Sequence, residues 1–459
     1  MATLPNPHSA GAYTHWKHRA PAGSLSHIPG DKGLPIVGNT FNILADPHGF
    51  VRKRVAKYGR VYKSHVFGGW QVALLGAQAN ELVLFDRAKI FSSEQGWGPM
   101  LDRLFPRGLM LLDFDKHRGD RRALSIAFKP EPMRHYCGAL NRGISERVDE
   151  WGAGGMHFYP AIKELTLDLA ADSFLGLPWG PEADRINRAF VDMVQASVAP
   201  IRRALPFTPM KRGVDGRAFL VDYFTREIAK RRAGDGMGQD MFSQFATARD
   251  DAGNLLPADE VVDHMNFLMM AAHDTITSSA TSLVLALAQN PEWQDRLRDE
   301  IMAVTGGRDL TYEDMGKLEL IEMAFKESLR MVPPVPSMPR RALREFEFGG
   351  YRIPAGTFCG INVHWTHHST DYWDDPELFD PPRFTREAEK ARHKYAWVPF
   401  GGGAHMCLGL HFAYMQVKVL MAQLLPKYRI VAEEGYEPEW QPWPIPKPRD
   451  GLKIELRPL

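Results

Sequence analysis

The sequence predicts a mainly helical fold with a minor β region, and three observations carry that prediction. Residues 139–300 show helical apolar spacing over most of their length. Within them, about 34 residues run from Pro257 to Asn290 without a helix breaker, which makes a rod of about 50 Å at about 1.5 Å per residue. Two pairs of β-prone runs, over residues 61–76 and 345–358, each flank a Gly-Gly pair, which is typical of β-hairpins.

The remaining elements follow in chain order. Residues 1–27 have neither an apolar core nor a cleavage pattern, so we expect a flexible arm and not a signal peptide. Residues 28–459 are expected to form one domain, with a β-rich N-terminal subregion and a large helical subregion. Residues 365–399 are rich in Pro, Asp and aromatic side chains without a clear period, which indicates an irregular packed meander. Helix spacing resumes at Leu408 and ends at Pro426.

Composition narrows the class of protein. Hydrophobic residues at 44% and charged residues at 24% are the proportions of a globular protein in water. A formal net charge of +1 gives no overall attraction to nucleic acid, and no nucleic-acid partner is expected. No stretch approaches the roughly 18–20 apolar residues of a transmembrane anchor. Three scattered cysteines favour a reducing, cytoplasmic location over a disulfide framework.

One cysteine stands in an unusual context. The stretch FGGGAHMCLG (Phe400–Gly409) places Cys407 behind a run of glycines and ahead of the last long helix. Three interpretations compete: a buried structural thiol, a zinc ligand, and a thiolate ligand at a helix N-terminus. Zinc is disfavoured, because His405 is too close to Cys407 in sequence and no second Cys/His pair has suitable spacing. Backbone N–H groups and the helix dipole lower a thiol pKa at such a position, and glycines let a flat macrocycle approach the backbone.

The spacing within this loop resembles a known signature. Phe400, Gly403, His405, Cys407 and Gly409 reproduce the pattern F-x-x-G-x-H-x-C-x-G, which resembles the haem-binding motif of the cytochrome P450 superfamily. The resemblance covers residues 28–455 and implies a triangular helical prism with a long central helix over the haem and small β-sheets. It implies haem b (iron protoporphyrin IX) as cofactor and Cys407 as the axial ligand of its iron, whose thiolate favours O–O cleavage. The other residues of this loop implied to contact the haem are Phe400, Gly401, Gly403, His405 and Gly409.

A second match involves charged residues before the meander. The stretch KESLR contains Glu327 and Arg330, which share a helix face. Alone, such a pair is common on protein surfaces and stabilises little. The stretch FDPPRF (Phe379–Phe384) follows, and the resemblance implies that Arg383 completes a Glu–Arg–Arg cluster. This cluster would act as a structural clamp on the meander beneath the haem.

The long helix carries a third match. AAHDT (Ala271–Thr275) resembles the family motif with an acid, Asp274, followed by an alcohol, Thr275. The alternative is that the hydroxyl only bonds back to a helix carbonyl and the acid faces solvent. Near a haem, the pair would deliver protons for O₂ cleavage, and Ala271 and Ala272 would leave room for O₂. Ala272 replaces the more usual Gly and Ile276 the frequent second Thr, and neither change removes the acid–alcohol pair.

Donors for the haem carboxylates are implied in three segments. The stretch DFDKHRGDRR (Asp113–Arg122) offers His117 and Arg121, one helical turn apart. Arg340 and His405 are the other implied propionate partners. The remaining basic residues near this helix either form a solvated face or a docking patch for an acidic electron donor; they are Arg118, Arg122 and Lys129.

The sequence therefore predicts a haem-dependent monooxygenase that inserts one atom of O₂ into a substrate C–H bond. No dinucleotide fingerprint follows a strand and no length remains for a fused reductase, so electrons are expected from NAD(P)H through a ferredoxin or flavodoxin with its reductase. One alternative is a peroxide-using peroxygenase or isomerase, which needs no acid–alcohol pair. The other is a haem-binding sensor without turnover, for which the pair has no purpose.

The substrate is expected to be lipophilic, such as a fatty acid, terpenoid or steroid, because the segments implied to line the pocket are mainly apolar and aromatic. Ordinary packing explains each of these side chains equally well. Arg202 or Arg203 could meet a substrate carboxylate or lie in a solvated loop. The expected pocket residues are Trp97, Met100, Leu101, Leu104, Phe105, Val335, Met338 and Trp443.

Overall fold

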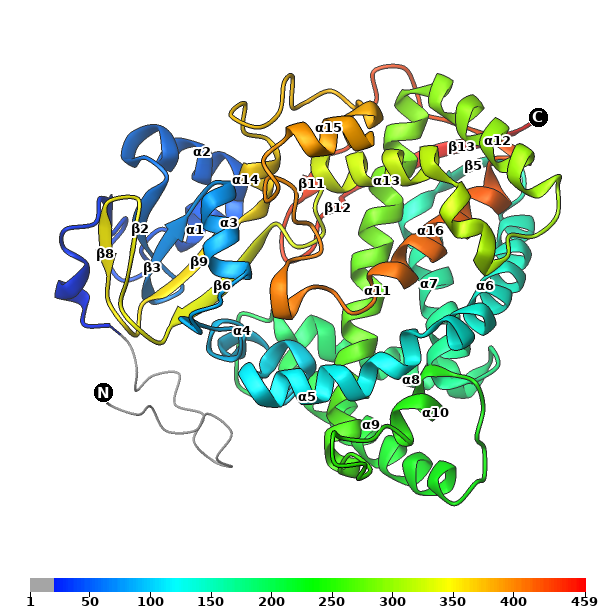
Figure 1. Ribbon diagram of the computed structural model, residues 1–459, viewed down its shortest axis with the longest axis horizontal. Helices are drawn as coiled ribbons and strands as arrows, with labels where there is room; N and C mark the ends of the chain where they lie inside the picture. Colours follow the sequence, from blue (N-terminus) through cyan, green and yellow to red (C-terminus); the bar gives the residue numbers. More distant parts are fainter. Residues whose placement is uncertain (1–19) are drawn as a thin grey trace.

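A single long helix, α11 (Ala258–Gln289), crosses the centre of the molecule (Figure 1). The computed structural model describes residues 20–459, and residues 1–19 of the predicted arm lie outside that range. Asp259 and Glu260 in the first turn complement the positive end of the helix dipole, and the helix ends before Pro291. Its 32 residues span about 48 Å, so the predicted central rod is confirmed.

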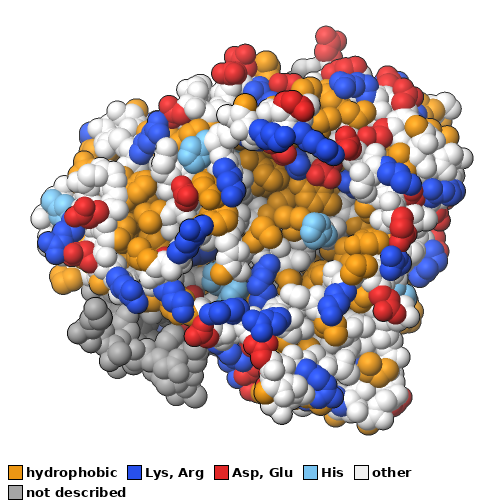
Figure 2. All heavy atoms as spheres, in the orientation of Figure 1, with side chains coloured by type: hydrophobic (Ala, Val, Ile, Leu, Met, Phe, Trp, Pro, Cys, Tyr) orange, Lys and Arg blue, Asp and Glu red, His pale blue; other side chains and the backbone are white. Residues whose placement is uncertain are grey.

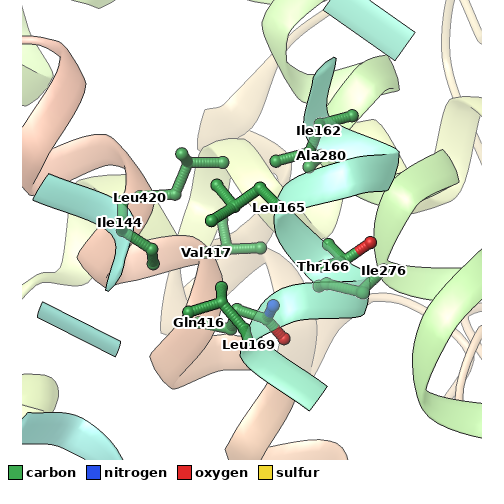
Figure 3. A pocket seen from close by; sticks show the side chains of 10 residues that line it. All are labelled: Ile144, Ile162, Leu165, Thr166, Leu169, Ile276, Ala280, Gln416, Val417 and Leu420. Atoms are coloured by element: carbon green, nitrogen blue, oxygen red, sulfur yellow. The ribbon is translucent and has the colours of Figure 1, made fainter. Parts of the chain in front are cut away.

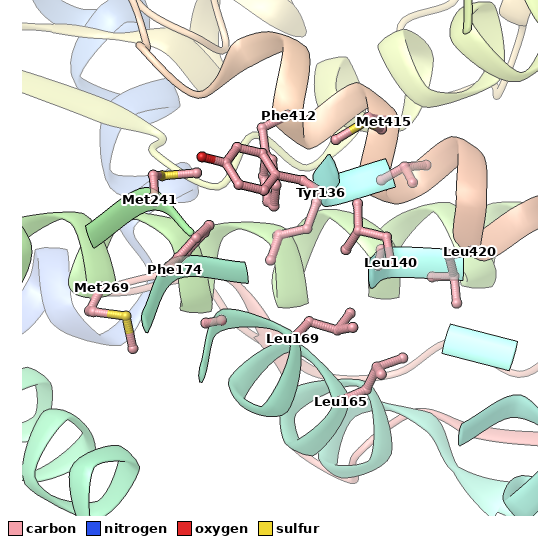
Figure 4. Packing of buried hydrophobic residues seen from close by; sticks show 14 of the residues in the cluster. Tyr136, Leu140, Leu165, Leu169, Phe174, Met241, Met269, Phe412, Met415 and Leu420 are labelled. Atoms are coloured by element: carbon pink, nitrogen blue, oxygen red, sulfur yellow. The ribbon is translucent and has the colours of Figure 1, made fainter. Parts of the chain in front are cut away.

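Most helices surround α11 on the side away from the main sheet, whereas α4 packs against that sheet. α7 packs along α11, α6 packs against α7 and α16, and α8 and α9 pair with each other (Figure 1). The contacts between α6, α7 and α16 bury aliphatic and aromatic side chains, with the Phe412 ring 5.9 Å from that of Tyr136 and 5.3 Å from that of Phe174 (Figure 4). These helices are α4 (Glu94–Leu101), α5 (Phe114–Leu124), α6 (Pro130–Trp151), α7 (Phe158–Leu175), α8 (Pro181–Ser197), α9 (Pro209–Arg232), α10 (Met241–Ala246), α12 (Pro291–Thr305), α13 (Glu319–Met331) and α16 (Leu410–Leu424).

The main sheet lies to one side of α11 (left in Figure 1) and has the strand order β1-β2-β3-β9-β6-β4. The predicted first hairpin is present: β2 and β3 are antiparallel, and Phe67 and Gly68 at the turn both have positive φ. α1 (Thr40–Ala45), α2 (Pro47–Tyr58) and α3 (Ala77–Leu84) belong to the same region. The strands are β1 (Gly30–Asp31), β2 (Val61–Val66), β3 (Gly69–Leu74), β4 (Phe91–Ser92), β6 (Ser337–Ala342) and β9 (Phe358–Asn362).

Three small sheets complete the β structure. The predicted second hairpin is β7 and β8, which turns on Gly349 and Gly350, both at positive φ. β13 pairs with β10 and with β5, and thereby joins the C-terminal strand to the segment between α6 and α7. The strands are β5 (Gly154–His157), β7 (Phe346–Phe348), β8 (Tyr351–Ile353), β10 (Tyr428–Val431), β11 (Trp440–Gln441), β12 (Lys447–Pro448) and β13 (Lys453–Pro458).

The packed part of the chain begins before the predicted boundary at residue 28. Residues Ala22–Leu25 form a 3₁₀ turn, and the Leu25 side chain is buried in the β-rich core. The Lys63 ammonium donates to the Leu25 carbonyl at 2.6 Å, and the His27 ring contacts the Arg352 carbonyl at 2.7 Å. Residues 20–27 therefore do not belong to the predicted arm. The sequence did not reveal this, because a single apolar side chain is too weak a signal for a packed turn.

The meander is mostly irregular, as its composition predicts. Its short ordered pieces are α14 (Val363–His367), a 3₁₀ turn at Pro381–Phe384 and α15 (Arg386–Ala391). Polar side chains cap two of them: Asn362 accepts from the Trp365 N–H at 2.6 Å, and Thr385 accepts from the Ala388 N–H at 3.3 Å. In residues 20–459, no helix combines the length and apolarity needed to cross a bilayer.

A small cavity remains where α6, α7, α11 and α16 meet (Figure 3). Its volume of about 10 Å³ is close to the least that a water molecule needs. Ile276 and Ala280 of α11 line it, together with Thr166, whose hydroxyl lies 2.9 Å from that of Thr277. Close packing therefore fixes the position of α11 just beyond the predicted acid–alcohol pair.

Stacked imidazoles join the β-rich region to the meander. The ring of His364 in α14 lies 3.5 Å from that of His48 in α2 and 4.0 Å from that of His368. Burial, followed by the charge of neighbouring groups, lowers the pKa of His48 and of His368 to about 4, and holds that of His364 well below its ordinary value. All three rings are therefore neutral in the folded protein at pH 7.

Acid should weaken this junction. Because the histidine pKa values are lower in the folded than in the unfolded chain, the unfolded chain binds more protons below pH 6.5, and the free energy of unfolding should fall by about 1–3 kcal/mol between pH 6.5 and 4. His364→Phe keeps a stacked ring that cannot be protonated, and should flatten this dependence in urea titrations. His411→Phe, at an exposed position, is the control; an equal flattening there would contradict the assignment.

Candidate functional site

The segment around Cys407 folds back on itself before α16 begins. The Cys407 N–H donates to the Phe400 carbonyl at 2.9 Å, and the Gly401 N–H donates to the Val398 carbonyl at 3.0 Å. Gly409 precedes the first residue of α16. The Cys407 side chain is exposed by its accessible surface, and the segment Phe400–Gly409, here called the cysteine loop, presents it at the start of a helix.

The electrostatics of the thiol differ from the expectation. Burial by nearby protein atoms raises the pKa of Cys407, and this outweighs the Gly409 N–H and the Arg121 charge, which act in the opposite direction. The helix N-terminus alone therefore does not make a thiolate here, contrary to the sequence-based expectation. A coordinated metal cation deprotonates a thiol outright, so the ligand role does not depend on a low pKa in the protein alone.

Protein packing requires glycine at two positions of the loop, Gly402 and Gly403. A Cβ on Gly403, whose φ is +60°, would lie 2.1 Å from the Leu84 carbonyl oxygen at the end of α3. A Cβ on Gly402 would lie 2.7 Å from the Phe85 ring, whereas one on Gly409 would meet only Phe128, at 3.9 Å. The sequence assigned these glycines to close approach of a macrocycle; at Gly403 the close approach is to the backbone after α3.

Four nitrogen donors from three distant segments converge beside this loop. The ring of His117 in α5 lies 3.9 Å from that of His405 in the cysteine loop. Arg121 of α5 and Arg340 of β6 lie near enough for their charges to lower the pKa of both rings, although burial is the larger cause. In residues 20–459, neither arginine forms an ion pair with a carboxylate. The cluster therefore presents positive charge and N–H groups without a carboxylate in contact; Asp113 acts on Arg340 by its charge alone, and one Arg340 N–H donates to the Pro339 carbonyl.

The neighbouring basic residues of α5 are largely engaged. Arg118 pairs with Asp115, and Arg122 pairs with Asp251 at 2.6 Å. Both arginine side chains are more than 60% exposed, so the pairs are weak and can exchange partners. Lys129 is exposed.

The predicted Glu–Arg–Arg cluster is assembled, with Glu327 and Arg330 fully buried and Arg383 half-buried. Arg330 donates to both carboxylate oxygens of Glu327, at 2.7 and 2.9 Å, and neither side chain is exposed. The Arg383 guanidinium lies 3.3 Å from Glu327, and the Asp380 N–H donates to the same carboxylate at 2.9 Å. Arg330 also donates to three carbonyls of the meander, those of His367, Pro376 and Leu378. These contacts fix α13 to the meander.

In the middle of α11, the predicted acid and alcohol turn to different partners. The Thr275 hydroxyl donates to the Ala271 carbonyl at 2.7 Å, while Asp274 lies 3.2 Å from the His273 ring and 3.4 Å from the Lys163 ammonium of α7. Burial disfavours the Asp274 carboxylate, but hydrogen bonds and charge from His273 and Lys163 prevail and lower its pKa to about 2. Asp274 is therefore a carboxylate at neutral pH, held toward α7. Ala271 is exposed and Ala272 half-buried.

Comparison with known proteins identifies the family. The family model described as Cytochrome P450 matches residues 28–455. The chain belongs to the cytochrome P450 family. Cytochrome P450 136 of Mycobacterium tuberculosis is 38% identical to it over 448 residues, which are 95% of this chain and 90% of the relative. Beta-amyrin 28-monooxygenase of Solanum lycopersicum is 29% identical, covering 94% of this chain and 92% of the relative.

A solved structure agrees with this assignment. The retinoic acid bound cyanobacterial CYP120A1 matches with a TM-score of 0.85 and 29% identity, over 94% of this chain and 99% of that chain. The predicted mainly helical P450 fold is thereby confirmed. As a cytochrome P450, the protein is a monooxygenase that uses a haem iron cofactor.

The residues of this P450 fit a haem. The cysteine loop offers one soft sulfur ligand, and beside it lie the four donors, which have no carboxylate in contact among the described residues and suit the two carboxylates of a haem. The Phe400 ring packs edge-on against Trp397 and near Tyr414, which supports the loop from the side of the meander and α16.

The residues predicted to line the substrate pocket divide into two groups. Leu101, Leu104 and Phe105 are buried in the main core, the last two completely, so packing accounts for them in this structure and their place at the pocket stays a prediction. Met338 is also buried, with its sulfur 3.9 Å from the position of a Cβ on Gly401. The partly buried members are Trp97, Met100, Val335 and Trp443.

Arg202 is not available for a substrate carboxylate in this structure. Its guanidinium donates to the Ser197 carbonyl at the end of α8, at 2.6 Å, and to the Met100 carbonyl of α4, at 2.8 Å. It thereby ties together two segments that flank the predicted pocket. Arg203 is exposed.

Sequence reasoning missed three residues of the site. Lys163 reaches Asp274 across 111 positions, and no sequence pattern marks it. His273 lies inside the AAHDT motif, so its proximity to Asp274 was available from the sequence. His367 receives the Arg330 bond through its carbonyl and lies in a segment without periodicity.

Gly403→Ala should displace the cysteine loop of this P450. The added Cβ has no room beside the Leu84 carbonyl and the backbone φ disfavours it, so we expect a loss of about 2–4 kcal/mol in the free energy of unfolding. Chemical denaturation of the haem-loaded protein measures it. Gly155→Ala in β5, at a position without positive φ and with no atom within 4 Å of the added Cβ, is the control and should cost less than about 1 kcal/mol; equal losses would contradict the packing argument.

Proposed function

We propose that this cytochrome P450 hydroxylates an isoprenoid substrate, with the Cys407 sulfur as axial ligand of haem b. The observation that carries the haem assignment is the convergence of His117, Arg121, Arg340 and His405 beside the cysteine loop, with no carboxylate of the described chain in contact. When bound, the haem supplies the activation of O₂ for C–H oxygenation. The protein supplies the ligand, the anchoring of the cofactor, the pocket and the protons.

Each residue of the site has a stated task in this proposal. The His117, Arg121, Arg340 and His405 side chains donate hydrogen bonds to the two propionates. Gly401 and Gly403 allow the cysteine loop to take its shape, and Phe400 and Gly409 complete its contact with the macrocycle. Ala271 and Ala272 keep α11 free of bulky side chains where O₂ must bind. Glu327, Arg330 and Arg383 clamp the meander behind the loop.

Protons are proposed to enter beside Lys163. Its side chain is about one-third exposed and contacts Asp274, so it brings water from the surface beside the carboxylate; protons then move along this water, and the ammonium keeps its own proton. Asp274 then turns from Lys163 toward the interior, where the Thr275 hydroxyl exchanges its bond to Ala271 for one to a water molecule. The route uses rotation of two side chains and no movement of the backbone.

The substrate class rests on the relatives. CYP120A1 is described as retinoic acid bound, and the relative from Solanum lycopersicum is named for β-amyrin. Both compounds are isoprenoids with large apolar skeletons. The partly buried apolar side chains at Trp97, Met100, Val335 and Trp443 suit such a ligand, so an isoprenoid is favoured over a fatty acid.

Electrons are proposed to come from NAD(P)H through a reductase and a ferredoxin or flavodoxin. Figure 2 shows the face with α5 and α15, where Lys and Arg side chains border a central group of apolar side chains. Arg118, Arg122 and Lys129 belong to α5 and the segment after it, and the weak pairs of the two arginines can exchange for the acidic side chains of a partner.

The haem-ligand assignment is tested by the absorption spectrum of the reduced, carbon-monoxide-bound protein. Thiolate ligation places the Soret band far to the red, and the native protein should show this band. Cys407→His should bind haem without it. Cys137→Ser, which alters a buried thiol away from the loop, is the control and should keep the band. A native protein that binds haem and lacks the band would overturn the proposal.

The proton route is tested by Thr275→Ala under O₂ with a reductase system. Loss of the hydroxyl should lower product formed per NAD(P)H consumed by roughly ten-fold or more, since general acid catalysis contributes at least that much. Thr281→Ala on the same helix loses the same kind of bond to a carbonyl four residues back, also at 2.7 Å, and should leave the yield unchanged. Unchanged yield in Thr275→Ala would contradict the route and favour peroxide use.

A further inference from the structure

His367 connects the buried ionic cluster to the cysteine loop. It is the last residue of α14, its side chain is fully buried, and its ring lies edge-on to Trp373 at 6.4 Å. Its carbonyl oxygen accepts from Arg330 at 3.0 Å. Its Nε2 atom accepts from the Val398 N–H at 3.1 Å. His367 thus bonds Arg330 of the Glu–Arg–Arg cluster through its backbone carbonyl, and it bonds Val398, just before the cysteine loop, through its ring.

The acceptor role of Nε2 fixes the state of the ring. A nitrogen that accepts from a backbone N–H carries no proton, so the proton of the neutral ring is on Nδ1. Burial, followed by the charges of His368 and Arg330, holds the pKa of His367 well below its ordinary value, which agrees with a neutral ring. Nδ1 is buried, and the backbone carbonyls of Leu329 and Arg330 lie near enough to favour a proton on the ring. This surrounding agrees with the proton on Nδ1 and leaves Nε2 directed at Val398.

The chain of bonds continues to the cysteine. The Val398 carbonyl accepts from the Gly401 N–H at 3.0 Å, and the Phe400 carbonyl accepts from the Cys407 N–H at 2.9 Å. Val398 is buried, so water cannot replace the His367 ring as its partner without a rearrangement. The first residue of the loop therefore takes its position from the segment that His367 holds.

We propose that His367 is a positioning residue for Cys407, which fixes the cysteine loop to the Glu327–Arg330 cluster through the Val398 N–H. The inference rests on the proposed function, because the sulfur position matters only if it binds iron. Without the Nε2 acceptor, the Val398 N–H is left unpaired and the segment from Val398 to Gly401 shifts. The Cys407 sulfur would then be held less firmly in the position from which it would bind the haem iron.

Three substitutions separate this role from packing. His367→Leu fills much of the space and removes the acceptor. His367→Gln places a carboxamide oxygen near the position of Nε2, whereas His367→Asn places its oxygen nearer Nδ1 and cannot reach Val398. Thermal stability alone does not decide, because His367→Leu also changes the packing of a buried side chain against Trp373.

The matched control is His364→Leu. It changes another histidine of α14, whose ring stacks on His48 and His368 and has no hydrogen bond to the cysteine loop in the described structure. This variant should lose stability and keep the native spectrum. It therefore shows what damage to α14 does when the link to Val398 is intact.

The test uses the haem-loaded protein and two measurements. The first is the fraction of reduced, carbon-monoxide-bound protein with the red-shifted thiolate band. The second is amide hydrogen exchange over residues 396–407. We expect His367→Leu and His367→Asn to lose at least half of the thiolate band and to exchange at least ten-fold faster in this segment. His367→Gln should recover most of both.

The outcomes distinguish the inference from the proposed function. A native protein without the thiolate band overturns the haem-thiolate assignment itself. If His367→Leu and His367→Asn both keep the thiolate band and the native amide exchange rates, the role of His367 is wrong. The haem-thiolate assignment then still stands. If His367→Leu does not assemble, the comparison of Gln with Asn decides: equal behaviour of the two overturns the inference.

Discussion

The buried ion pair between Glu327 and Arg330 is the interaction on which the cysteine-bearing side of the molecule depends. A buried pair often gains little by itself, because removing two charges from water costs about as much as their attraction returns. Here all five N–H groups of Arg330 have acceptors: two carboxylate oxygens and the carbonyls of His367, Pro376 and Leu378. The meander has little regular structure of its own, so these bonds replace the ones that a helix or sheet would provide.

Hydrogen bonds connect this cluster to the cysteine loop, first through the His367 ring and then through backbone groups. The end of α3 contacts the loop from its other side. The contact at Gly403 leaves no space for a side chain, so the position of the loop is set by two parts of the chain far apart in sequence. The four donors around it come from α5, β6 and the loop itself. A positive cluster of this kind is costly in an isolated protein and is stabilised by an anionic ligand.

The long helix serves both stability and chemistry. Its C-terminal half is buried and closely packed against α7, where Thr166 and Thr277 join the two helices. Near the middle of α11 fewer side chains are buried, and Asp274 pairs with Lys163 of α7. The ion pair keeps a charged carboxylate stable beside an apolar pocket, and its partly exposed lysine gives that carboxylate access to water.

The sequence by itself determined the central helix, both hairpins, the irregular meander, and the motifs around Cys407, Glu327 and Asp274, because these are local patterns of spacing and turn residues. Only the tertiary structure decided which groups meet: Lys163 with Asp274, Gly403 with the backbone after α3, and His367 with Val398. It also showed that Leu104 and Phe105 are core residues and that the Cys407 pKa is raised. Contacts between distant segments and the desolvation of a charge depend on packing in three dimensions, and no local pattern in the chain records them.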